Sequence, residues 1–211
     1  MEFSTHDFRH AREILENRDS WGELVMAARS ITREDVLRVH GAFEAEGKRS
    51  PAGGQTSINR LFRERLAPSG WIEEPRLFPA NQKALRKWKM DFIKARIGVE
   101  VSFNHAEAVP WTFTRLNIAG ESDKVIPEHR IDVGVAFFAT ETLKGWARMD
   151  SAVGTFELAN AWLEMMRPIM PIPILVVGLS ADGWPNTDAF RGTKSFRKPA
   201  EPASVPLSPI D

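Results

Sequence analysis

The amino-acid sequence predicts an α/β protein with a central mixed β-sheet flanked by helices. Three features of its hydrophobic pattern lead to this fold class. The first half carries apolar residues at helical spacing, two adjacent segments in the middle alternate apolar and polar residues, and two later apolar runs enclose an amphipathic helix. A strand, a helix and a second buried strand in that order are typical of neighbouring parallel strands.

Three helices are expected in the first third of the chain. Apolar side chains recur at helical spacing within residues 8–15 and again within 36–43. Thr32 is expected to cap the second of these helices, because two acidic residues follow it at the start of the pattern. A loop rich in proline and glycine at 49–57 precedes a third helix at 58–66.

The strands of the sheet are expected in the remainder of the chain. The two alternating segments, 88–94 and 97–103, predict a β-hairpin. The other elements are expected in the following order: a helix at 112–120, a strand at 131–140, a helix at 155–166 and a strand at 172–179.

The composition is that of a single soluble domain, expected at residues 1–193, followed by a mobile, proline-rich tail at 194–211. Of the 211 residues, 43% are hydrophobic and 27% are charged, which is enough to build a core. No apolar run is long enough to span a membrane, and the N-terminus lacks the apolar core of a signal peptide. The absence of cysteine excludes disulfides and thiolate metal sites, so a cytoplasmic protein is expected.

The charge is balanced overall but not locally. Lysine and arginine together number 28, as do aspartate and glutamate. A basic cluster nevertheless surrounds Asp91, consisting of Lys83, Arg86, Lys87, Lys89, Lys94 and Arg96. Such a cluster is either a solvated face or a surface for an anionic partner.

The predicted hairpin brings two acidic residues together. If residues 95–96 form a two-residue turn, Lys94 pairs with Ile97 and Asp91 lies opposite Glu100, with Cβ atoms roughly 5 Å apart. Alanine and arginine are poor residues for such a turn, so a bulge that shifts the register is an alternative. In the first register the apolar residues of the first strand, Trp88, Met90 and Phe92, share one face with those of the second.

Two opposed carboxylates repel each other, and a divalent cation between them would remove the repulsion. Magnesium prefers carboxylate oxygens together with waters and substrate phosphate. The alternative is an exposed edge, where Asp91 pairs with Lys89 or Lys94 and Glu100 lies at the surface.

The stretch "KMDFIKARIGVEVSFNH" resembles the active-site hairpin of the PD-(D/E)xK nucleases. More narrowly, the chain resembles type II restriction endonucleases of the BglII group, which includes relatives such as BstYI and BamHI. Further segments follow in the order of that group as far as about Trp184: "HAREIL", "GQTSINRLFRERLAPSGW", "IDVGVAFFATETL", "MDSAVGTFELANAWL" and "MPIPILVVGL". The resemblance implies a restriction-endonuclease-like fold.

The resemblance also implies roles for individual residues. Asp91 and Glu100 match the two metal-binding acids, and Ser102 takes the third catalytic position, where relatives have lysine, glutamine or glutamate. A glutamine at this position is therefore expected to be accepted. Glu74 falls where the group brings a further polar or acidic side chain into the site.

The implied activity is hydrolysis of phosphodiester bonds in double-stranded DNA at a short palindrome, centred on GATC in the relatives. Mg²⁺ held by the two acids, with Mn²⁺ as a substitute, would activate a water and stabilise charge on the phosphate. A homodimer matches the twofold symmetry of a palindrome. A cognate DNA methyltransferase would be a further partner.

The residues expected to contact DNA lie in two segments and on the hairpin. In the BglII group, residues just past the third catalytic position and at the start of the later helix read the DNA sequence. The resemblance therefore implies this role for Asn104, His105, Asp150 and Ser151, whose short polar side chains suit base-edge contacts. A capping or packing role is the alternative for His105. Lys89 and Lys94 would contact the phosphates.

Two other functions stay open. One is a repair or structure-specific nuclease of the same fold. The other is a DNA-binding module with weakened catalysis, because the serine at 102 supplies no positive charge and is no useful base at neutral pH.

Overall fold

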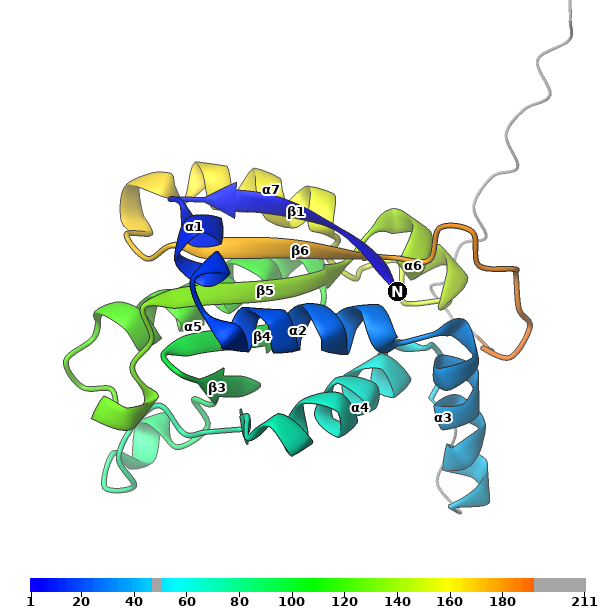
Figure 1. Cartoon of the computed structure of the whole chain (residues 1–211), viewed down its shortest axis with the longest axis horizontal. Helices are drawn as coiled ribbons and strands as arrows, with labels where there is room; N and C mark the ends of the chain where they lie inside the picture. Colours follow the sequence, from blue (N-terminus) through cyan, green and yellow to red (C-terminus); the bar gives the residue numbers. More distant parts are fainter. Residues whose placement is uncertain (47–50, 192–211) are drawn as a thin grey trace, which may run out of the picture.

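The computed structural model describes residues 1–46 and 51–191, and its centre is a six-stranded mixed sheet in the order β1-β6-β5-β4-β3-β2 (Figure 1). Its three central strands run parallel to one another, and each strand outside them is antiparallel to its neighbour. The predicted mixed sheet is thus confirmed. The strands are β1 (Glu2–Phe8), β2 (Ile72–Glu73), β3 (Phe92–Lys94), β4 (Ile97–Val101), β5 (Val133–Ala139) and β6 (Ile174–Ser180).

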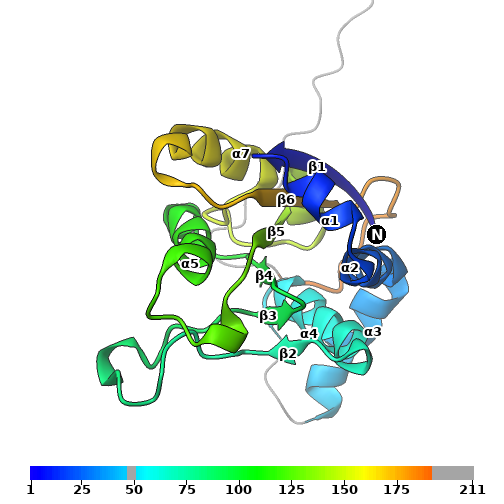
Figure 2. The same cartoon turned by 60° about the vertical axis from the view of Figure 1, so that its left-hand side comes forward.

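Helices cover both faces of the sheet, with α2 and α4 on one side and α5 and α7 on the other (Figure 2). The helices are α1 (Ala11–Glu16), α2 (Asp19–Ser30), α3 (Arg33–Ala45), α4 (Gln55–Leu66), α5 (Val109–Glu121), α6 (Glu141–Trp146) and α7 (Phe156–Met165).

The buried residues of the sheet divide between two hydrophobic cores because side chains alternate along a strand. In β5, Val133 and Val135 face the core that α1, α2 and α4 cover. Ala136 and Phe138 face the core that α5 and α7 cover. The hairpin of β3 and β4 therefore lies in a sheet that is packed on both faces.

Most predicted elements are confirmed, but two expectations at the edges of the sheet are wrong. Phe8 ends β1 rather than belonging to a helix, and α1 begins at Ala11. Residues 88–91 do not continue β3, which begins at Phe92. The expected cap is present, since the Thr32 hydroxyl accepts a hydrogen bond from the Asp35 backbone N–H at 3.1 Å.

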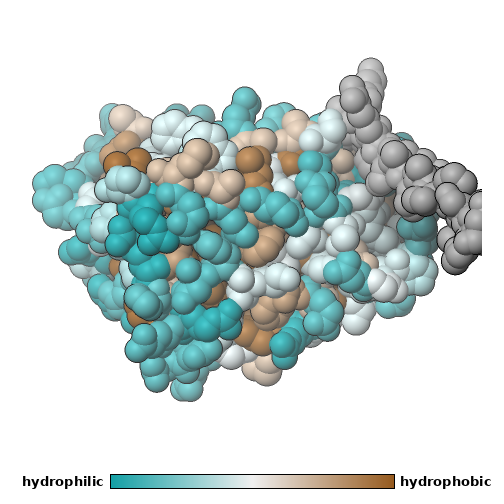
Figure 3. Space-filling model, turned by 90° about the horizontal axis from the view of Figure 1, so that it is seen from above, coloured by the Kyte–Doolittle hydropathy of each residue, from teal (hydrophilic) through white to brown (hydrophobic). Residues whose placement is uncertain are grey.

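The face seen in Figure 3 is largely hydrophilic and carries only separate hydrophobic patches. None of the helices in the described ranges is long and apolar enough to cross a membrane. The expected tail at 194–211 falls outside the described residues.

Candidate active site

The hairpin has the predicted register in spite of its unfavourable turn residues. Phe92 pairs with Val99 and Lys94 with Ile97. The intervening residues, Ala95 and Arg96, have φ angles of 47° and 61°, the left-handed conformation that a two-residue type I′ turn requires. Each costs of order 1 kcal/mol in a residue with a Cβ atom. Contacts to the turn offset this strain, including a 2.8 Å hydrogen bond from Arg96 Nε to Asp132 Oδ1 and a 2.9 Å bond from Arg18 Nη1 to the Ala95 carbonyl.

The expected common face for Trp88, Met90 and Phe92 is wrong. Phe92 packs in the core beneath α4, whereas Met90 and Trp88 pack in the core beneath α5. The alternation breaks because the chain bends at Asp91 before the strand begins. Gly98 makes room for this path, since a Cβ atom there would lie 2.5 Å from the Met90 sulfur.

Asp91 is fixed at the point where the hairpin opens. Its side-chain Oδ2 accepts a 2.7 Å hydrogen bond from the Val101 backbone N–H, and its carbonyl accepts one of 3.0 Å from Glu74. The carboxyl group is largely buried, and this burial raises its pKa, an effect that the Val101 N–H partly opposes. The residue is therefore held at the site by its backbone as well as by its side chain.

Glu100 is a buried acid, with 2% of its surface exposed. One carboxylate oxygen, Oε2, accepts a hydrogen bond from the Arg115 guanidinium of α5. The other, Oε1, is buried without a hydrogen-bond partner. Burial, followed by the charge of Asp91, raises the pKa of Glu100 well above its usual range.

The alternative of an exposed edge is contradicted. Lys89 pairs with Glu74 at 2.6 Å, and Lys94 pairs with Glu23 at 2.7 Å. Neither lysine pairs with Asp91. Lys94 also donates to the Ser69 carbonyl, so its ammonium group is used within the fold.

The Asp91–Glu100 pair fits a divalent cation. Two neighbouring acids with raised pKa values and an unpartnered buried oxygen have more negative charge than their surroundings balance. Within residues 1–46 and 51–191, no group of three or more His, Cys, Asp or Glu side chains could hold a metal. Magnesium accepts so small a set, because it retains waters and binds through one or two carboxylates.

Ser102 directly follows β4, and two hydrogen bonds fix its hydroxyl group. It is 3% exposed, and its hydroxyl accepts hydrogen bonds from Thr112 Oγ1 at 3.2 Å and Asn104 Nδ2 at 3.4 Å. A glutamine here would need space that Thr112 and its neighbours fill. The acceptance of glutamine therefore stays a prediction, and the burial of Ser102 indicates that it would cost stability.

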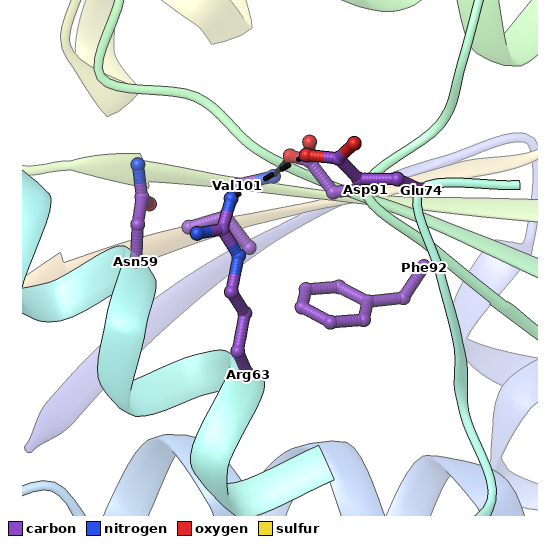
Figure 4. Close-up of a pocket in the computed structure, with 6 residues that line it drawn as sticks. All are labelled: Asn59, Arg63, Glu74, Asp91, Phe92 and Val101. Atoms are coloured by element: carbon purple, nitrogen blue, oxygen red, sulfur yellow. Dashed lines mark hydrogen bonds and ion pairs between the residues drawn. The ribbon is translucent and has the colours of Figure 1, made fainter. Parts of the chain in front are cut away.

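A cavity of about 30 Å³ adjoins Asp91 (Figure 4). Figure 4 shows Asn59 and Arg63 projecting from α4 toward Asp91 and Glu74, which lie on the opposite side of the cavity. Asn59 Oδ1 is buried without a hydrogen-bond partner, and Arg63 pairs with Glu73 at 2.8 Å and with Glu74 at 3.7 Å.

Asn59 and Arg63 were not predicted as site residues. They are one helical turn apart on an element distant in sequence from the hairpin. The only signal in the sequence was a polar pair at this spacing among apolar residues, which is equally typical of a solvated helix face.

Glu74 lies at the rim of the cavity, on a backbone with φ of 47°. A left-handed conformation in a residue other than glycine costs of order 1 kcal/mol, and such strained residues are frequent at functional sites. The hydrogen bond from Lys89 and its charge lower the pKa of Glu74, so the group is ionised at neutral pH.

The two segments expected to contact bases lie side by side at the end of β4. The Asn104 carbonyl accepts a 2.9 Å hydrogen bond from Gly154, and residues 105 and 153 form a β-bridge. Asn104, His105 and Ser151 are exposed. Asp150 is less so, and its Oδ1 accepts a hydrogen bond from the Ala152 N–H that shapes the turn.

Comparisons with known proteins identify the family of the chain. A family model described as "Restriction endonuclease BglII/BglIII" matches residues 3–179. The chain belongs to this family. No curated protein sequence matches it.

Solved structures of BglII show the same fold as this endonuclease. BglII complexed with a DNA 16-mer is 20% identical and has a TM-score of 0.65, with 86% of this chain and 78% of that chain covered. Free BglII is 19% identical and has a TM-score of 0.54, with 86% and 81% covered.

Removing the partner of Glu100 is expected to destabilise the metal-free protein. We expect Arg115→Leu to lower the free energy of unfolding by about 2–4 kcal/mol, because the buried carboxyl group of Glu100 loses the partner of Oε2 while Oε1 has no hydrogen-bond partner. Glu100→Gln in the same background should restore most of this loss. Urea unfolding of both single variants and the double variant, in chelator at neutral pH, measures the coupling. Purely additive effects would show that the pair does not interact.

Because the pKa of Glu100 is raised, the stability of the metal-free protein should depend on pH. The folded protein retains a proton on Glu100 more readily than the unfolded chain does. Stability of the metal-free protein should therefore fall as pH rises above the ordinary glutamate value of 4.5 toward the folded pKa. Glu100→Gln should lack this component of the decrease.

Proposed function

We propose that this protein is a type II restriction endonuclease that hydrolyses double-stranded DNA at a short palindrome, using Mg²⁺ or, as a substitute, Mn²⁺. Membership of the BglII/BglIII family supports a site-specific DNA nuclease. The observation that carries the metal dependence is the buried Asp91–Glu100 pair, in which Glu100 has an unpartnered oxygen.

Asp91 and Glu100 would hold the metal, and the protein keeps both in place before it binds. The Val101 N–H orients Asp91, and the Arg115 guanidinium balances the charge of Glu100. When bound, the ion supplies a water of lowered pKa and stabilises negative charge on the reacting phosphate.

The cavity at Asp91 has room for one or two waters but not for a phosphate. The scissile phosphate would therefore lie at its rim, where Arg63 can donate hydrogen bonds to it. Asn59 and Glu74 would orient the attacking water from either side. Ser102 would act only indirectly, by fixing the end of β4 through Thr112.

The palindrome would be read by Asn104, His105, Asp150 and Ser151, which the fold brings to one place. Their polar groups suit base edges in the major groove. By resemblance to the BglII group, we also propose that the recognised palindrome is centred on GATC. A cognate methyltransferase would protect the host DNA, and the protein would act in the cytoplasm.

We expect the endonuclease to be a homodimer in solution or on its DNA. The chain carries the Asp91–Glu100 pair once, whereas a duplex has two strands to cut, and twofold protein symmetry matches a palindrome. The helical first half is the expected interface. Light scattering of the free protein and of its complex with a palindromic duplex measures the mass. A monomer under both conditions would contradict this expectation.

A DNA-binding module without cleavage is the second candidate function. The observation that favours it is Ser102, an uncharged residue engaged by Thr112 and Asn104 at a position that often carries a lysine. A plasmid-nicking assay with Mg²⁺ and with Mn²⁺ separates the two functions. Cleavage confined to one palindrome would in turn exclude a repair or structure-specific nuclease.

A further inference from the structure

The segment between β2 and β3 is ordered by internal hydrogen bonds and by aromatic packing. Hydrogen bonds join its two arms, from Leu77 N–H to the Trp88 carbonyl at 3.0 Å and from Met90 N–H to the Pro75 carbonyl at 3.2 Å. Phe78 and Trp88 stack edge to face with ring centroids 6.1 Å apart. These apolar residues belong to the core beneath α5, so the segment holds its outer residues in place.

The outer residues of this segment form an open, positively charged depression, which we call the basic pocket. Its volume is about 570 Å³, and its lining consists of Arg76, Ala80, Lys83, Arg86, Lys87 and Lys89. Figure 2 shows the segment extending from the edge of the sheet beside β2 and β3.

The structure divides the basic cluster seen in the sequence into two parts. Lys94 and Arg96 are used in ion pairs with Glu23 and Asp132. In contrast, four exposed cations of the basic pocket form no ion pair with any residue that the structure describes: Arg76, Lys83, Arg86 and Lys87. In a chain with zero formal net charge, four unpaired like charges around one depression repel each other unless an anion lies among them.

One ion pair links the basic pocket to the cavity at Asp91. Lys89 lines it and pairs with Glu74 at 2.6 Å, and Glu74 lines the cavity at Asp91. A β-bridge also joins Lys89 to Arg76. An extended anion with one end at Asp91 would therefore meet the basic pocket next.

We propose that the basic pocket binds the phosphates that flank the scissile phosphate on the same DNA strand. This inference rests on the proposed function and adds a part of the DNA-contact surface that the hairpin and the base-reading segments do not supply. Each strand of duplex DNA carries a phosphate about every 3.4 Å of helix axis, so a strand that passes Asp91 presents successive phosphates to the cations that line the basic pocket. The contacts are with phosphates, so they strengthen binding without selecting a sequence.

The test is the salt dependence of DNA binding. The triple variant Lys83→Gln, Arg86→Gln and Lys87→Gln removes three positive charges from exposed positions. The control removes two exposed cations that form ion pairs outside both the pocket and the helical first half, Lys124→Gln with Arg167→Gln, and is compared with the pocket double variant Lys83→Gln with Lys87→Gln. Fluorescence anisotropy with a labelled duplex of about 30 base pairs, in chelator, is measured between about 50 and 200 mM KCl.

We expect the wild-type protein and the control to show the same slope of log K against log salt. The pocket double variant should have a slope smaller in magnitude by about 2 and the triple variant by about 3, since each lost phosphate contact removes about 0.9. A pocket double variant with the slope of the control would overturn the inference and leave the proposed function intact. A wild-type protein that binds no duplex DNA would overturn both.

Discussion

Replacing Asp91 or Glu100 with alanine is expected to reduce DNA cleavage by about 1000-fold or more while the protein remains folded. The two carboxylates are the proposed ligands of the catalytic ion, and among the described residues no group of three or more His, Cys, Asp or Glu side chains could hold the ion instead. Removing one acid from a crowded buried pair relieves repulsion, so metal-free stability should not collapse. Single-turnover cleavage at saturating Mg²⁺, with circular dichroism for folding, measures both effects.

Conservative variants separate catalysis from structure. Asp91→Asn retains an oxygen that can accept the Val101 N–H, and Glu100→Gln retains the shape of the side chain. Both should be as inactive as the alanine variants. Asp123→Asn and Glu128→Gln, at exposed positions, are the matched controls and should cleave normally. Cleavage at the wild-type rate by Asp91→Asn or Glu100→Gln would refute the site assignment.

Glu74→Ala should reduce cleavage by about 100-fold or more, the range for loss of a positioned catalytic group. Glu74 lies beside Asp91 at the water-sized cavity, on a strained backbone. Ser102→Ala should cost much less, because its hydroxyl is bound to Thr112 rather than directed at the reacting groups. Single-turnover cleavage of a plasmid compares the variants.

Glu73→Ala is the internal control for Glu74→Ala. Both acids pair with Arg63, but only Glu74 lines the cavity. Equal losses in the two variants would indicate that the effect passes through Arg63. An inactive Ser102→Ala beside an active Glu74→Ala would show that the two roles are reversed. Ser102→Gln should be less stable than the wild type, by about 1–3 kcal/mol, because it overfills a buried position.

The register of the hairpin could be predicted from the sequence, because a shift by one residue would turn the apolar side chains of β4 to the opposite face of the sheet and would place Glu100 in the core beneath α4. The conformation of the turn could not. Ala95 and Arg96 have no intrinsic preference for positive φ, and the contacts from Arg18 and Asp132 that hold them come from distant parts of the chain. β1 was missed because it is an edge strand whose polar residues alternate only weakly with apolar ones.

The proximity of Asp91 and Glu100 could be predicted from the sequence, but the residues that surround them could not. Asp91 and Glu100 share a short segment, so spacing alone relates them. Arg115, Asn59 and Arg63 come from α5 and α4, and only the packing of these helices on the sheet brings them to the acids. Distant partners were also missed in the basic cluster, because the sequence did not show that Lys94 and Arg96 form ion pairs with acidic residues elsewhere in the chain.

The most direct test of the metal-dependent, site-specific endonuclease is digestion of unmethylated genomic DNA by the purified protein, followed by sequencing of the fragment ends. We expect ends that share one short palindrome, that form with Mg²⁺ and not in chelator, and that are absent with Glu100→Gln. Ends without a common sequence, or equal cleavage by Glu100→Gln, would contradict it.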